Sequence, residues 1–213
     1  MAVNLELKDL VHDIAASIKR IDARRPQAAN ARTGALYQPG IGPHPETQAV
    51  NLVVAELAEL ASDRYSKRLQ IGVPYRMGRQ KCDLCIGDPL SWNWAVEIKM
   101  LRLMGDNGKP NDNMLMHILS PYPNDRSALT DCMKLANSGL AGRKAVVIYG
   151  FDYPGRPMDP AIEAFELLAA KWVRLIGRAV GSYNDLVHPV HREGRVFGWE
   201  IVSIDAKNAT AEG

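Results

Sequence analysis

The 213-residue chain has few cysteines, no apolar run long enough to span a membrane and almost no net charge. Three cysteines are a low and odd number for a disulfide framework, which favours a reducing, cytoplasmic location. Charged residues near the start, Glu6, Lys8 and Asp9, exclude the apolar segment of a secretory signal. A formal net charge of +2 is too small to attract a polyanion, so a nucleic-acid partner requires a local basic patch.

The rest of the composition is that of an ordinary globular chain, with 46% hydrophobic and 23% charged residues. A chain of this length can bury a core without disulfides or structural metals. We expect residues 1–44 to form an N-terminal amphipathic helix, over 4–22, and a basic aperiodic loop suited to oligomer or DNA contact. Residues 45–205 are expected to form the main domain, and residues 206–213 a disordered tail.

The hydrophobic periodicity of the main domain predicts an alternation of helices and strands. The expected elements are a helix at 45–65, strands at 69–75, 81–87 and 94–101, a helix at 125–139, a strand at 144–151, a helix at 159–179 and a strand at 195–204. Three consecutive strands can form an antiparallel meander, and the next strand can join the sheet through a right-handed crossover. The predicted fold class is a three-layer α/β/α sandwich with a central mixed β-sheet.

The stretch KCDLCIGDPLSWNWAVEIKM, residues 81–100, places charged side chains on otherwise apolar strands. Because side chains alternate between the faces of a strand, Glu97 and Lys99 are predicted to share a face. If the two strands pair as a hairpin, Asp83 comes opposite Glu97. Neighbouring carboxylates repel each other unless a divalent cation lies between them, and such ligands suit Mg²⁺, with Mn²⁺ as a substitute. The alternative is a structural ion pair with Lys99.

Cys82 and Cys85 in the same stretch have the spacing of a zinc-binding C-x-x-C pair. On a strand, residues three apart face opposite ways, and the chain holds no second pair of this kind. His188 and His191 could complete a zinc site in principle, but a loop before the last strand is the expected place for them. We expect both cysteines to lie in the core, since cysteine is among the most buried residue types.

The charged motif resembles that of the PD-(D/E)xK, or restriction-endonuclease-like, nuclease superfamily. The resemblance rests on the segments CD and VEIK, which contain Asp83, Glu97 and Lys99, and on the α-β-β-β-α-β order over residues 45–151. It implies a restriction-endonuclease-like core in which Asp83 and Glu97 bind the metal and Lys99 positions the attacking water. Cys82 stands where the signature has proline.

Many members of that superfamily carry a further acid on the first core helix, for which the sequence offers three candidates. Glu46 lies in the first turn and is the expected additional metal ligand, with a favourable contact to the helix dipole as its alternative role. Glu56 and Glu59 lie deeper in the helix and are predicted to form its solvated edge. Lys134, on the helix predicted over 125–139, is a candidate for phosphate contact or a plain surface lysine.

Together these features predict a Mg²⁺-dependent endonuclease that hydrolyses DNA phosphodiester bonds, as a type II restriction enzyme or a related defence nuclease. Duplex DNA is the expected substrate, and cutting two strands favours a homodimer or higher homo-oligomer. Two alternatives remain. One is a module without catalytic activity, or one stabilised by zinc, that binds nucleic acid or another partner. The other is a nuclease of the same fold that acts on RNA.

Overall fold

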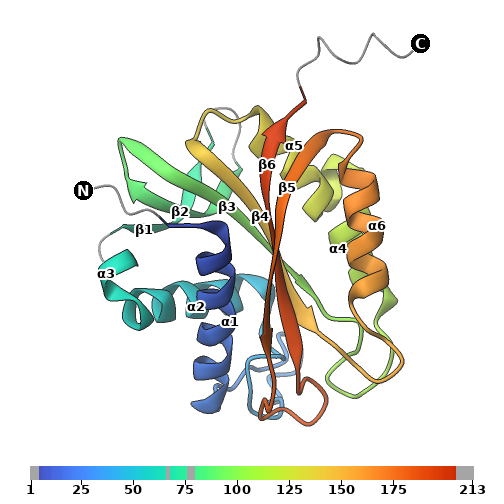
Figure 1. Cartoon of the computed structure of the whole chain (residues 1–213). Helices are drawn as coiled ribbons and strands as arrows, with labels where there is room; N and C mark the ends of the chain where they lie inside the picture. Colours follow the sequence, from blue (N-terminus) through green and yellow to red (C-terminus); the bar gives the residue numbers. More distant parts are fainter. Residues whose placement is uncertain (1–4, 66–67, 76–79, 205–213) are drawn as a thin grey trace.

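The computed structural model describes residues 5–65, 68–75 and 80–204 of the chain, and a six-stranded mixed sheet lies at its centre (Figure 1). The strand order is β1-β2-β3-β4-β6-β5. The strands are β1 (Leu69–Pro74), β2 (Lys81–Asp88), β3 (Ser91–Leu101), β4 (Ala141–Phe151), β5 (Val173–Tyr183) and β6 (Gly194–Ser203). The α-helices are α1 (Leu7–Ala23), α2 (Glu46–Leu60), α3 (Ser62–Tyr65), α4 (Met116–Leu119), α5 (Ala128–Asn137) and α6 (Asp159–Ala169).

Helices cover both faces of the sheet, as two neighbouring residues of β6 demonstrate (Figure 1). Gly198 faces α1, and a Cβ atom at this position would lie only 2.5 Å from Cγ2 of Val11. Trp199 points the other way and donates a hydrogen bond from Nε1 to Glu166 of α6 at 2.8 Å. Since successive side chains of a strand alternate between faces, α1 and α6 lie on opposite sides of the sheet.

The strand pairings agree with the predicted topology of the first four strands. β1, β2 and β3 pair in antiparallel fashion, and β4 joins β3 in parallel. Between them α5 begins after Ser127, whose Oγ accepts a hydrogen bond from the N–H of Thr130 at 3.2 Å. Ser127 is one of the two caps that the sequence offers for the helix predicted over 125–139.

The helix predicted over 159–179 is wrong in its second half, because α6 ends at Ala169 and the chain continues as strand β5. β5 pairs with β6 at the edge of the sheet, with a register shift between Ile176 and Ala179 around a glycine in a left-handed conformation. At Gly181 a Cβ atom would lie 3.0 Å from that of Ala15 on α1. Pairing with β6, the next strand along the chain, therefore overrides the local helical spacing of the apolar residues.

The N-terminal amphipathic helix is present as α1, and its apolar side packs on β5, β6 and α2. It also binds Glu56 of α2, whose side chain is 1% exposed and lies 2.5 Å from Arg20 Nε and 2.7 Å from Arg24 Nη2. The prediction that Glu56 belongs to a solvated edge is wrong, because Arg20 of α1 and Arg24, directly after that helix, compensate its buried charge. Glu59 is exposed, as predicted.

The residues that the structure describes include no helix with both the length and the apolar character to cross a bilayer. The disordered tail predicted for residues 206–213 lies outside the described residues.

Candidate functional site

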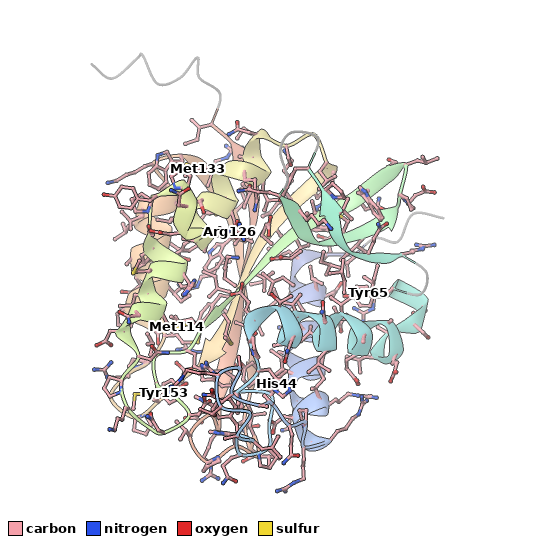
Figure 2. All side chains as sticks on the ribbon, turned by 180° about the vertical axis from the view of Figure 1, so that it is seen from behind. His44, Tyr65, Met114, Arg126, Met133 and Tyr153 are labelled. Atoms are coloured by element: carbon pink, nitrogen blue, oxygen red, sulfur yellow. The ribbon has the colours of Figure 1, made fainter. Side chains whose placement is uncertain are left out.

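Strand β3 directs Glu97 and Lys99 toward the helix α5, so the two side chains share a face as the sequence predicts. Oε1 of Glu97 lies 2.7 Å from Nζ of Lys134, and Nζ of Lys99 lies 2.9 Å from Oδ2 of Asp131. Both partners are on α5. Figure 2 shows α5, where Met133 is labelled, and the beginning of α2, which both contact β3.

Asp83 lies where β2 and β3 stop pairing. The last pair of the ladder on this side joins Leu84 to Val96, and Asp83 is the next residue of β2 beyond that pair. Instead of completing another pair, the Asp83 carboxylate accepts a hydrogen bond from the N–H of Ile98 at 2.9 Å. The separation of the strands thus gives room for a half-buried carboxylate beside β3.

Glu46, the first residue of α2, approaches β3 from the helix end. Its Oε2 accepts a hydrogen bond from the N–H of Met100 at 2.8 Å, and its Oε1 lies 3.4 Å from Nζ of Lys99. Its side chain is 31% exposed, whereas Glu56 is buried against α1. Of the candidate helix acids, Glu46 is therefore the one that joins Lys99.

The sequence analysis did not identify Asp131, and it predicted for Lys134 a phosphate contact or a surface position. The pattern that could have indicated both is an acid and a lysine three residues apart, which places the two side chains on one side of a helix. Tyr75 is buried beside the cluster, and its hydroxyl donates a hydrogen bond to Glu97 Oε1 at 2.6 Å. We call Glu46, Asp83, Glu97, Lys99, Asp131 and Lys134 the acid–lysine cluster.

The acid–lysine cluster holds four carboxylates against two ammonium groups, an excess of two negative charges if all are ionised. Burial raises the pKa of Glu97 well above its usual value, and the carboxylates of Asp131 and Asp83 raise it further. Burial also raises the pKa of Glu46. Burial alone would lower the pKa of Lys99, but Asp131 and Glu46 outweigh it, and the net shift is upward. Lys99 is therefore a charged donor at neutral pH.

The chemistry of the donor set fits a hard divalent cation, since all of the acids offer oxygen ligands and carry excess negative charge. Oδ2 of Asp131 is buried and receives no hydrogen bond, although it lies close to Lys99. No three of these acids bring ligand oxygens within 4.8 Å of one another, and one oxygen each of Glu97 and Glu46 is paired with a lysine. Glu97 is only 1% exposed, so solvent reaches the cluster beside Glu46 and Asp83.

A second candidate metal site lies elsewhere, at Asp106, His188 and His191. Among the described residues, this is the one group of three acidic, histidine or cysteine side chains whose ligand atoms lie within 4.8 Å of one another. His191 Nε2 lies 2.9 Å from Asp106 Oδ1, and its Nδ1 lies 2.7 Å from the Tyr153 hydroxyl. Arg102 Nη1 is 3.3 Å from the same Asp106 oxygen, which places a positive charge where a cation would bind.

This group lies among loops at the end of the molecule away from Met133, where Tyr153 is labelled in Figure 2. His188 and His191 are in the loop before β6, as predicted, and both are buried. Their rings stack with centroids 4.6 Å apart. His188 Nδ1 accepts hydrogen bonds from the N–H groups of Val190 and His191, so the neutral ring carries its proton on Nε2.

Cys82 and Cys85 are both fully buried on β2, which confirms their predicted place in the core. Interaction with Cys85, followed by burial, raises the pKa of the Cys82 thiol. The Cys82 thiol also donates to the carbonyl of Val96 at 3.4 Å. Zinc binds cysteine as a thiolate, whereas the Cys82 thiol is protonated and hydrogen-bonded, which disfavours a zinc site at this pair.

Comparisons of the chain with protein-family models, with curated proteins and with solved structures each found no match.

Proposed function

We propose that the chain is a Mg²⁺-dependent endonuclease that hydrolyses DNA phosphodiester bonds, with Mn²⁺ able to replace Mg²⁺. The observation that carries this proposal is the arrangement of charged side chains along β3. Glu97 and Lys99 share one face of the strand, Glu46 lies 3.4 Å from Lys99, and Asp83 accepts a hydrogen bond from the N–H of Ile98 on the same strand. The element order α2-β1-β2-β3-α5-β4 supports it, because it is the order of the restriction-endonuclease-like core that the sequence resembles.

In this proposal Asp83, Glu97 and Glu46 hold the cation. A divalent cation bound there would neutralise charge on the scissile phosphate and lower the pKa of a water molecule. Lys99 positions that water. Because neighbouring carboxylates raise its pKa, Lys99 acts as a hydrogen-bond donor and not as the general base.

The proposed substrate is duplex DNA and the proposed assembly is a homodimer, since each copy supplies one set of these acids and a duplex needs two cuts. A type II restriction enzyme or a related defence nuclease matches this description. Arg126 lies near the end of the segment that connects β3 to α5, where it is a candidate for phosphate contact.

The test is a cleavage assay on supercoiled plasmid, linear duplex and RNA, each with Mg²⁺, Mn²⁺ or EDTA. We expect nicking and linearisation of the plasmid only with a divalent cation, and a loss of at least about 100-fold in Lys99→Ala and Asp83→Asn. Lys144→Ala is the matched control, because Lys144 donates to the carbonyl of Ala136 and contacts none of the acids.

Equal cleavage by the wild type and Lys99→Ala would remove the proposed mechanism. Cleavage of RNA but not of DNA would change the substrate, and metal-independent cleavage would remove the role of the acids. Analytical ultracentrifugation of the wild type tests the homodimer directly.

A further inference from the structure

Lys134 is bound by two carboxylates from different elements. Its Nζ lies 2.7 Å from Oε1 of Glu97 on β3 and 2.7 Å from Oδ1 of Asp131 on its own helix. The hydroxyl of Tyr75 donates to the same Glu97 oxygen. A positive charge is thus held between β3 and α5, in contact with two buried acids.

These acids need a positive charge between them. The side chains of Glu97 and Asp131 are 2% and 3% exposed, so water screens their mutual repulsion poorly. Lys99 compensates Asp131 from the other side, through Oδ2, but it does not contact Glu97 in this arrangement. Among the residues that the structure describes, removing the Lys134 ammonium without replacement would leave Glu97 with the Tyr75 hydroxyl as its remaining hydrogen-bond partner.

Lys134 differs from its two acids in one respect, because its side chain is 22% exposed. The ammonium therefore has a route to solvent that the acids lack. Its four-carbon stem is flexible, and an ammonium gains full hydration on leaving. The carboxylates, in contrast, are fixed on β3 and α5, and carboxylate oxygens are the ligands that Mg²⁺ and Mn²⁺ prefer.

We propose that Lys134 occupies a divalent-cation position between Glu97 and Asp131, and that it withdraws its ammonium toward solvent when Mg²⁺ or Mn²⁺ binds. Asp131 then becomes a metal ligand, which the superfamily resemblance did not assign. This inference rests on the metal site of the proposed function but not on DNA cleavage. Lys134 holds the two acids together before the cation arrives, and it weakens the apparent metal affinity by competing for them.

The first test is calorimetric titration of the DNA-free protein with MnCl₂ and MgCl₂ at pH 8. We expect Lys134→Met to bind about tenfold more tightly than the wild type, because the competing ammonium is gone. Lys144→Met is the matched control and should bind as the wild type does, since it removes an ammonium that touches only the carbonyl of Ala136. Circular dichroism checks that both variants fold.

The second test uses the wild type alone and so does not depend on a variant. Reductive methylation followed by peptide mass spectrometry should label Lys134 slowly in EDTA and several-fold faster with Mn²⁺. Lys171, an exposed lysine, is the internal reference and should not change.

The outcomes separate this inference from the proposed nuclease. Metal-dependent DNA cleavage with unchanged Lys134 labelling, or with no gain in affinity for Lys134→Met, would overturn the inference and leave the nuclease intact. Metal binding that releases Lys134 without any cleavage would support the inference and remove the nuclease. Failure of the wild type and of Lys134→Met to bind either cation would overturn both.

Discussion

The carboxylate of Glu46 reaches from the first residue of α2 to β3, where it accepts the backbone N–H of Met100 at 2.8 Å. This bond fixes the start of the helix against the strand that carries Glu97 and Lys99. It also explains why a charged side chain at a helix start is only partly exposed.

Glu46→Gln is expected to weaken Mn²⁺ binding by about tenfold while the fold is retained. The glutamine oxygen can still accept the Met100 N–H, but the negative charge that attracts a cation is lost. Calorimetric titration with Mn²⁺ measures the effect, and thermal unfolding verifies the fold. Unchanged Mn²⁺ affinity would exclude Glu46 from the ligand set.

Glu56→Gln, on the same helix, should lower the stability of the fold and leave Mn²⁺ binding unchanged. The substitution weakens the buried ion pairs with Arg20 and Arg24, so we expect the free energy of unfolding to fall by about 1 kcal/mol. Mn²⁺ affinity should not change, because Glu56 faces α1. Urea unfolding provides the measurement, and Glu59→Gln, at an exposed position, is the control.

Glu97→Gln is expected to flatten the pH dependence of stability in EDTA. The folded-state pKa of Glu97 lies well above the ordinary value of 4.5, so its contribution is greatest below that value and is lost as the pH rises through the folded pKa. Glutamine keeps an acceptor for Tyr75 and Lys134 without the buried charge. Urea unfolding from pH 5 to pH 9 should therefore show a gain in stability for Glu97→Gln that grows with pH.

A gain in stability that is constant with pH would contradict this account of Glu97. The comparison requires EDTA throughout, because a bound cation would favour the ionised wild-type carboxylate and reverse the difference.

His188 should make the protein less stable at acidic pH. Burial, followed by the neighbouring His191 ring, lowers the pKa of His188 from 6.5 to about 4. Its contribution to stability is therefore complete above pH 6.5 and is lost as the pH falls toward 4, by at most about 3 kcal/mol. The oxygen of His188→Asn can accept the same backbone N–H groups but cannot titrate. Unfolding curves of this variant should lose that pH dependence, and an unchanged slope would mean that another group causes it.

Arg195 is expected to resist conservative replacement. Its guanidinium donates to both oxygens of Asp152 and both oxygens of Asp159, at 2.6–2.9 Å. Lysine cannot reproduce this planar arrangement, so Arg195→Lys should lower the free energy of unfolding by about 1 kcal/mol. Arg192→Lys, at an exposed position of the preceding loop, is the control and should unfold as the wild type does.

The sequence by itself determined the features that depend on neighbouring residues. Alternation along β3 placed Glu97 and Lys99 on one face, and the three apolar segments predicted the meander of β1, β2 and β3. Ser127 indicated where α5 begins. These signals are local, because side-chain direction and capping are set within a few residues of the chain.

Only the tertiary structure decided which elements meet. The apolar spacing in residues 170–179 suits a helix, and pairing with β6 made it strand β5. Glu46 and Glu56 lie on one helix, and only the position of α1 directs one to β3 and the other to Arg20. Asp131 and Lys134 reach Glu97 and Lys99 because α5 packs on β3, a contact between residues far apart in the chain. No local pattern encodes such contacts, since they depend on how helices and strands pack across the whole core.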